Sequence, residues 1–139
     1  RESLKILSNE MEINNKIEFL GNSDEIPSIL RSVDMFVMPS HWEGLSIALL
    51  EAVSTGLPVV ATDVGSNKRV LESCYVPYKV VTPNSAEEIA KAIIDLSDEI
   101  KQRKVAVTEK NTYLDPKFDI ENFVREHETL YSRIVAERS

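Results

Sequence analysis

The sequence predicts an α/β fold in which a doubly wound parallel sheet carries helices on both faces. Short apolar runs alternate with longer segments of helical periodicity, which is typical of βαβ units. Residues 35–39 (MFVMP) are continuously apolar, as in a strand that is buried on both faces, and residues 58–62 (PVVAT) predict another buried strand. The length of 139 residues suits one domain with one core, so we interpret residues 1–139 as a single domain.

The first four expected elements are two helices and two strands. Apolar side chains at helical spacing predict a helix over residues 3–12. Residues 16–21 (KIEFLG) predict a short strand that ends at its glycine. A helix over 22–34 follows, because a serine and an aspartate can cap its start and four apolar side chains form one face. The apolar strand over 35–39 comes next.

The middle of the chain continues the alternation. Gly56 ends a helix, and a proline just beyond it prevents the helix from continuing. Ser85 and Glu88 form a capping box, which predicts that a helix begins near residue 86. The expected elements are helix 45–56, strand 58–62, helix 64–73, strand 78–83 and helix 86–101.

The C-terminal part of the chain predicts a loop and one more helix. Residues 102–118 are polar and loosely patterned, which is typical of a frayed helix end and a loop. Asp119 caps the last expected helix. Its apolar side consists of Ile120, Phe123, Val124, His127, Leu130, Tyr131 and Ile134.

The expected sheet is smaller than those of most doubly wound domains. Such domains usually have about five or six strands, whereas four are expected here. The chain also begins at Arg1 and not at a methionine. We therefore expect that one or two N-terminal strands are missing and that the chain is a piece of a longer protein.

Composition argues against several classes of protein. The net charge of -7 and the pI of about 4.9 disfavour a nucleic-acid-binding protein, which usually has a basic stripe. No apolar run approaches the roughly 20 residues of a membrane span, and no signal-peptide pattern opens the chain. One cysteine and two histidines give no zinc pattern, and the cysteine usage fits a reducing cytoplasm. Nothing in the pattern supports Cys74 as a nucleophile.

The stretch from Pro39 to Gly65 contains the candidate ligand site. In an open parallel sheet, ligands bind outside the carboxyl ends of the strands, and residues 41–46 (HWEGLS) lie at such an end. The first turn of the following helix leaves backbone N–H groups unpaired and adds partial positive charge. Gly44 permits close approach of a ligand, so the amides of Leu45 and Ser46 predict a phosphate site.

Two carboxylates flank this expected phosphate site. Glu51 lies about 7–8 Å along the helix and leans back toward its N-terminus, while Glu43 precedes Gly44. Ionised carboxylates accept hydrogen bonds from hydroxyl groups, so a diphosphate between a ribose and a sugar fits the spacing. The alternative is that Glu43 is a solvated loop residue, that Glu51 stabilises the helix end or pairs with a lysine, and that Gly44 only forms a turn.

A longer pattern surrounds the two carboxylates. DMFVMPS (34–40), EGLSIALLE (43–51) and EAVSTGLPVVATDVG (51–65) together resemble the C-terminal, nucleotide-sugar-binding domain of GT-B glycosyltransferases. The closest kind is the retaining "group 1" type, glycosyltransferase family four, whose motif has two glutamates separated by seven residues. The resemblance is specific over residues 17–72 and implies a Rossmann-like domain that is truncated at its N-terminus.

The resemblance implies a role for each matching residue. Glu43 would contact hydroxyls of the donor sugar as the catalytic carboxylate, and Glu51 would hold the ribose. The remaining implied contacts are Gly44, Leu45 and Ser46 with the donor phosphates, and Gly21 and Asn22 near the nucleobase. His41 and Trp42 occupy a variable part of the motif, and Trp42 could equally pack within the loop.

The resemblance also implies partners. The donor would be a UDP- or GDP-linked sugar, with no cofactor and no metal. A saccharide or lipid-linked acceptor would bind mainly to the missing N-terminal domain, so this chain alone is expected to be inactive. The longer protein would be cytoplasmic, with possible peripheral association with the inner face of the membrane, and would not bind nucleic acid.

Three departures from the family pattern keep other functions open. The usual turn G-G-x-x-E reads here as GSNKR (65–69), with Arg69 in place of the acid. Residues 73–83 (SCYVPYKVVTP) lack the usual glycines, and the basic pair that clamps the diphosphate would precede this chain. The alternatives are a related nucleotide-sugar epimerase, a non-catalytic partner subunit and a flavodoxin-like module.

Overall fold

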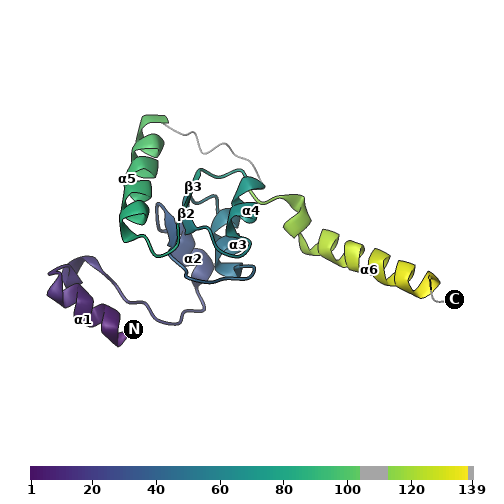
Figure 1. The fold of residues 1–139 in the computed structure, drawn as a ribbon, viewed down its shortest axis with the longest axis horizontal. Helices are drawn as coiled ribbons and strands as arrows, with labels where there is room; N and C mark the ends of the chain where they lie inside the picture. Colours follow the sequence, from purple (N-terminus) through teal and green to yellow (C-terminus); the bar gives the residue numbers. More distant parts are fainter. Residues whose placement is uncertain (104–112, 138–139) are drawn as a thin grey trace.

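A computed structural model describes residues 1–103 and 113–137 of the chain. Three parallel strands form its sheet in the order β1-β2-β3: β1 (Phe36–Met38), β2 (Val59–Thr62) and β3 (Tyr78–Val81) (Figure 1). Val59 of the central strand pairs with Phe36 on one side and with Tyr78 on the other. The predicted parallel α/β sheet is therefore confirmed.

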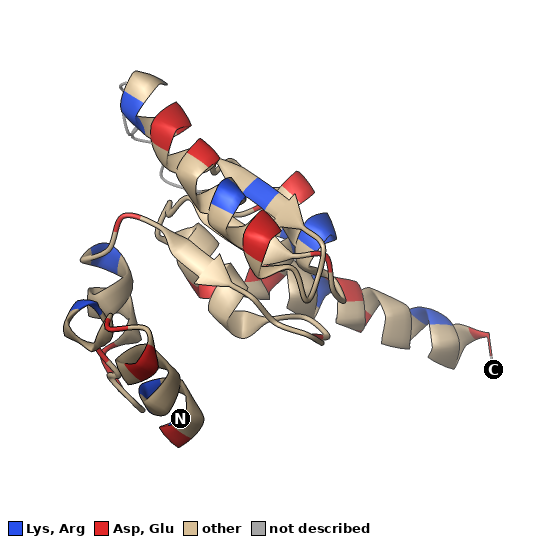
Figure 2. Cartoon of the chain, turned by 60° about the vertical axis from the view of Figure 1, so that its left-hand side comes forward, with Lys and Arg blue, Asp and Glu red and all other residues tan. Residues whose placement is uncertain are grey.

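Helices connect and flank the strands. The α-helices are α1 (Glu2–Glu10), α2 (Ile26–Arg31), α3 (Ile47–Ser54), α4 (Asn67–Glu72), α5 (Ala86–Arg103) and α6 (Ile120–Ala136). Two short 3-10 helices are η1 (Asn14–Lys16) and η2 (Pro116–Phe118). Acidic and basic residues are interspersed along α1 and α5 (Figure 2).

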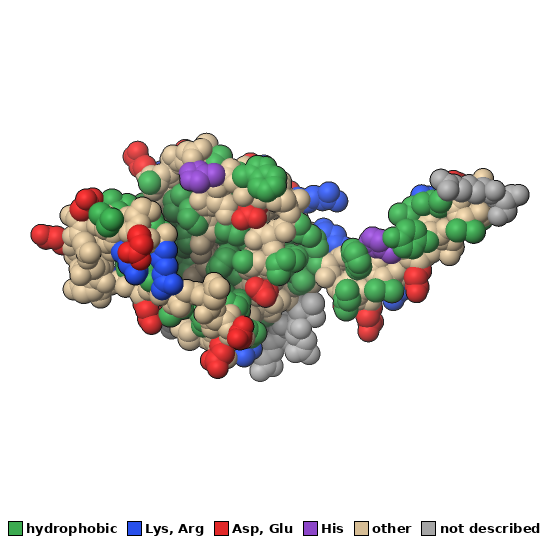
Figure 3. Space-filling view, turned by 90° about the horizontal axis from the view of Figure 1, so that it is seen from below, with side chains coloured by type: hydrophobic (Ala, Val, Ile, Leu, Met, Phe, Trp, Pro, Cys, Tyr) green, Lys and Arg blue, Asp and Glu red, His purple; other side chains and the backbone are tan. Residues whose placement is uncertain are grey.

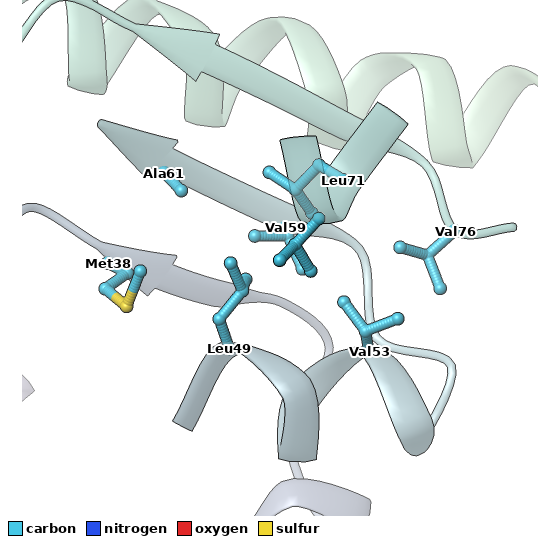
Figure 4. Packing of buried hydrophobic residues seen from close by; sticks show 8 residues of the cluster. Met38, Leu49, Val53, Val59, Ala61, Leu71 and Val76 are labelled. Carbon is cyan, nitrogen blue, oxygen red and sulfur yellow. The ribbon is translucent and has the colours of Figure 1, made fainter. Parts of the chain in front are cut away.

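The sheet buries both of its faces, as the doubly wound prediction requires. Alternate residues of a strand point to opposite faces. Val59 and Ala61 of β2 therefore pack with Leu49 of α3 and Leu71 of α4 on one face (Figure 4). Val60, between them, packs on the other face with the α5 side chains Ala92 and Leu96. Every residue of β2 is buried, which explains why residues 59–61 are all apolar.

Capping side chains confirm two predicted helix starts. Ser85 accepts a hydrogen bond from the backbone N–H of Glu88 (3.2 Å) at the start of α5. The Glu88 carboxylate accepts from the backbone N–H of Thr82 (3.0 Å), so it ties the helix to the end of β3. Asp119 accepts from the backbone N–H of Glu121 (3.4 Å) and begins α6.

The strand predicted over residues 16–21 is wrong. Asn14–Lys16 form a 3-10 helix, and residues 17–20 have no sheet partner in the described part of the chain. A strand is stable only when a neighbour takes its backbone hydrogen bonds. Here the carbonyl of Phe19 accepts instead from the Arg1 guanidinium (2.6 Å). The sheet has three strands and not four because this segment lacks a neighbouring strand.

The last helix, α6, projects away from the sheet (Figure 1). Its apolar face is exposed: Phe123, Val124, Leu130 and Tyr131 lie on the surface, and no residue of the helix is buried. Green side chains follow its length in Figure 3. The loop expected over residues 102–118 falls partly on residues 104–112, which lie outside the described ranges. Among the described helices, none is long and apolar enough to cross a bilayer.

Substitution of Leu71 tests the core. Leu71 is 0% exposed and fills the space between α4 and β2, whereas Leu4 on α1 is 58% exposed. Leu71→Ala should lower the free energy of unfolding by about 2–5 kcal/mol, because it removes buried methyl groups and leaves a cavity. Leu4→Ala should change it by less than about 0.5 kcal/mol. Urea unfolding followed by circular dichroism measures both, and equal effects would contradict this packing.

Candidate functional site

The loop between β1 and α3 lies at the carboxyl edge of the sheet. We call residues 39–46 the motif loop, and residues 63–66, which follow β2, the glycine turn. Since β1 and β2 are parallel neighbours, both segments leave the sheet at the same edge. Ligands of open α/β sheets bind at this edge.

Backbone contacts hold the glycine turn against the motif loop. Gly65 has a φ of +54°, which side-chain-bearing residues rarely adopt. A Cβ there would overlap the carbonyl oxygen of Glu43 and lie 2.6 Å from that of Gly44. The backbone N–H of Ser66 donates to the Gly44 carbonyl (2.9 Å). Gly65 is therefore required both for its own conformation and for close approach of the two segments.

Two hydroxyl groups orient Glu43. The Ser40 hydroxyl donates to the Glu43 carboxylate (2.9 Å). The hydroxyl of Thr62, buried at the end of β2, donates to the backbone carbonyl of Ser40 (2.7 Å). The carboxylate of Glu43 is thus positioned from a buried strand, although Glu43 itself is only partly buried.

Ser46 begins α3, and its hydroxyl is engaged within the fold. It accepts from the backbone N–H of Leu49 (3.3 Å) and donates to the sulfur of Met38 (3.3 Å). By contrast, no hydrogen bond from the backbone N–H of Leu45 or Ser46 is found within the described residues. These two amides at a helix N-terminus are the groups that the motif loop offers to an anion.

The other predicted site residues are exposed but are not tied to the motif loop. Glu51 lies on the exposed side of α3, and none of the ion pairs in residues 1–103 and 113–137 includes it. Gly21 has a φ of +76°, and the Arg1 guanidinium packs against it. Asn22 is exposed beside it. The structure brings together Glu43, Gly44 and the start of α3, but no hydrogen bond or ion pair found among the described residues joins them to residues 21–22.

Sequence reasoning missed Ser40, Thr62 and Asn67 as supports of the site. Asn67 is 0% exposed, and its amide nitrogen donates to the Thr62 carbonyl (3.1 Å), which fastens α4 to the end of β2. Its side-chain oxygen has no partner among the described residues. The signal for Ser40 was its spacing of three residues before Glu43, within hydrogen-bond reach of a loop carboxylate. Nothing in the sequence links Thr62 or Asn67 to the motif loop.

A cavity of about 410 Å³ adjoins the motif loop. It is lined by Leu45, Ser66, Arg69, Val70, Lys117, Phe118 and Glu126. Arg69, which replaces the acid expected at this position, is exposed and lines this cavity. Lys117 pairs with Asp115 (3.1 Å). The pKa of Asp115 lies below its usual range. The main cause is a hydrogen bond that its carboxylate accepts from the backbone N–H of Lys117, and a hydrogen bond from the Lys117 side chain adds to it.

Cys74 is unsuited to nucleophilic chemistry. It is partly buried beside the core of α3, α4 and β2, and this burial raises the pKa of its thiol above the usual value. A raised pKa leaves less of the reactive thiolate at neutral pH. The expectation that Cys74 has no catalytic role therefore has a physical basis.

A parallel sheet with helices packed on both faces, and a loop at its carboxyl edge with two backbone amides that are unpaired among the described residues, defines the class of doubly wound α/β domains. The family model described as "Glycosyl transferases group 1" matches residues 1–112. The chain belongs to this family.

Named relatives agree with the family. The chain is 31% identical over 90 residues to an Escherichia coli UDP-Gal:alpha-D-GlcNAc-diphosphoundecaprenol alpha-1,3-galactosyltransferase, a match that covers 65% of this chain and 23% of the relative. It is 27% identical over 128 residues to the N-acetyl-alpha-D-glucosaminyl L-malate synthase of Bacillus anthracis, covering 92% of this chain and 33% of that protein.

A solved structure has the same fold. Sucrose-phosphate synthase from Thermosynechococcus elongatus superposes with a TM-score of 0.73 and 21% sequence identity, over 98% of this chain and 34% of that one. This likeness supports the Rossmann-like architecture. The chain therefore spans only part of each of these proteins: 23% of the galactosyltransferase, 33% of the glucosaminyl L-malate synthase and 34% of sucrose-phosphate synthase.

Two glycine substitutions test the contact between the glycine turn and the motif loop. Gly65→Ala should destabilise the fold by about 1–3 kcal/mol, because a positive φ and a backbone overlap both oppose it. Gly44→Ala is the matched control, since a Cβ at Gly44 meets nothing within 4 Å. Urea unfolding gives the stabilities, and amide chemical shifts of residues 40–46 should move more in Gly65→Ala. Equal stabilities would rule out the contact.

Proposed function

We propose that this chain is the nucleotide-sugar-binding part of a retaining glycosyltransferase of family four. The enzyme would transfer a hexosyl group from a UDP- or GDP-linked donor to an acceptor in polysaccharide, glycolipid or cell-envelope glycan synthesis. The observation that carries the proposal is the start of α3, where the unpaired amides of Leu45 and Ser46 lie beside the oriented carboxylate of Glu43. Membership of the glycosyl transferases group 1 family supports it.

In this proposal the donor lies across the motif loop. The amides of Leu45 and Ser46 donate to the donor phosphates, where the α3 dipole adds partial positive charge. Gly44 has no neighbour within 4 Å of its Cβ direction, so it leaves room for them. Glu51 accepts from the ribose hydroxyls, and Gly21 and Asn22 lie near the nucleobase.

The chemistry assigned to Glu43 follows from its charge and its fixed position. Departure of the nucleoside diphosphate leaves positive charge on the sugar ring and adds negative charge to the phosphates. Glu43 accepts from donor-sugar hydroxyls and stabilises the positive ring, while the helix N-terminus stabilises the leaving phosphates. The Ser40 hydroxyl holds the carboxylate in place before the reaction, so little reorganisation is needed. The proposal includes no metal and no other cofactor.

The acceptor would bind outside this chain. Relatives named for diphosphoundecaprenol-linked substrates, from Escherichia coli and Campylobacter jejuni, support a lipid-linked saccharide as one acceptor class. A further N-terminal domain would hold it, and the enzyme would work in the cytoplasm or at the inner face of the membrane. The chain alone would bind the donor without transferring the sugar.

Glu51→Ala tests the proposal that the Glu51 carboxylate binds the ribose hydroxyls of the donor. It should weaken binding of UDP or GDP by about tenfold, because a charged hydrogen-bond acceptor is lost. Glu10→Ala, on the exposed end of α1, is the control and should leave affinity unchanged. Isothermal titration with UDP, GDP and their glucose or mannose derivatives measures the effect. Unchanged affinity in Glu51→Ala would remove Glu51 from the site, and no binding to wild type would refute the proposal.

Glu43→Gln separates catalysis from binding in the longer protein that carries this chain. The amide keeps the size of the side chain but loses its charge, so turnover should fall by about 100-fold or more while the affinity for the nucleoside diphosphate changes little. Steady-state kinetics and titration of the same preparation measure the two quantities. Equal losses in turnover and affinity would show a purely binding role for Glu43.

A further inference from the structure

Trp42 is the only tryptophan of the chain, and it is 84% exposed. Tryptophan is usually largely buried, because its ring has the largest apolar surface of any side chain. No hydrogen bond or ring contact of Trp42 is found in residues 1–103 and 113–137. The sequence left open that Trp42 packs within its loop. The structure shows instead that its ring is exposed.

The loop that carries Trp42 is firmly held. On one side of it, Thr62 holds the backbone of Ser40. On the other side, Gly65 and Ser66 pack against the backbone of Glu43 and Gly44. The exposure of the ring therefore does not follow from a loose loop. The fold presents an apolar, flat surface one residue away from the carboxylate assigned to the donor sugar.

We propose that Trp42 stacks on the pyranose ring of the donor sugar, an inference that rests on the proposed function. One face of a pyranose ring displays C–H groups, and their partial positive charge attracts the electron-rich face of an indole. The hydroxyls around the ring edge remain available to Glu43. Trp42 would then recognise the sugar, whereas the start of α3 would recognise the phosphates.

Charge and position favour a sugar over other flat or apolar ligands. The nucleobase lies beyond the ribose, and the ribose carboxylate Glu51 is nine residues along the chain from Trp42. A membrane surface is disfavoured because the motif loop (PSHWEGLS) has no lysine or arginine to attract anionic lipids. The residue that follows the ring is an acid, Glu43, which such lipids would repel.

The single tryptophan provides a direct measurement, because all indole fluorescence of the chain comes from the proposed platform. The 139-residue chain is titrated with UDP, UDP-glucose, UDP-galactose, GDP and GDP-mannose. At least one nucleotide sugar should shift the emission to shorter wavelength and reduce acrylamide quenching. The matching nucleoside diphosphate should bind without either change, because it lacks the pyranose ring.

Variants supply the second measurement, by isothermal titration. Trp42→Ala should weaken binding of that nucleotide sugar by about 5- to 10-fold, in keeping with the strength of a stacking contact. Its affinity for the nucleoside diphosphate should stay as in wild type. Trp42→Phe should retain most of the affinity. His41→Ala is the matched control, since His41 is the exposed neighbour of Trp42 in the same loop.

Each contrary outcome has a distinct meaning. If UDP or GDP alone changes the emission as strongly as the nucleotide sugar, the ring stacks on the nucleotide and the inference is wrong. If nucleotide sugars bind but the emission does not change and Trp42→Ala binds as wild type does, the ring serves another partner and the inference is again wrong. If wild type binds neither class of ligand, the proposed function itself fails, and this inference fails with it.

Discussion

The close approach of Gly65 to the backbone of Glu43 and Gly44 is the constraint on which the candidate site depends. It joins the turn after β2 to the loop after β1, so two segments about twenty residues apart form one surface. Only glycine satisfies both the positive φ and the short distance. The Gly44 carbonyl accepts from the backbone N–H of Ser66 there, while no hydrogen bond from the amides of Leu45 and Ser46 is found among the described residues.

The buried central strand, β2, holds this surface in place through hydrogen bonds at its end. All four residues of β2 are buried, and its side chains join the cores on both faces of the sheet. At the end of β2, Thr62 forms hydrogen bonds. Its hydroxyl donates to the backbone carbonyl of Ser40, and its backbone carbonyl accepts from the side-chain amide of Asn67. Helix α4 and the motif loop are thus both fastened to the same strand end. Through Ser40, this strand end orients the carboxylate of Glu43.

Sequence patterns predicted the elements whose stability is local or whose burial is complete. Residues 59–61 are recognisable because burial on both faces of the sheet demands apolar side chains, and α5 because its cap and its apolar stripe agree. The apolar run 35–39 is also recognisable, although β1 is only partly buried. The prediction failed at residues 16–21, since β propensity cannot supply a neighbouring strand. Glu43 and Glu51 stood out by their spacing. Thr62 and Asn67 did not, because their role arises only from contacts between segments distant in the chain.

Exposed apolar side chains lie in different settings on α6 and on the motif loop. On α6 they form one face of a helix that projects from the sheet, and the charged residues of that helix are of both signs. Trp42 is a single ring on a fixed loop, and its two neighbours along the chain, His41 and Glu43, are polar. A ligand with one apolar face and a hydroxylated edge satisfies Trp42 and Glu43 at once, and a sugar ring has this form.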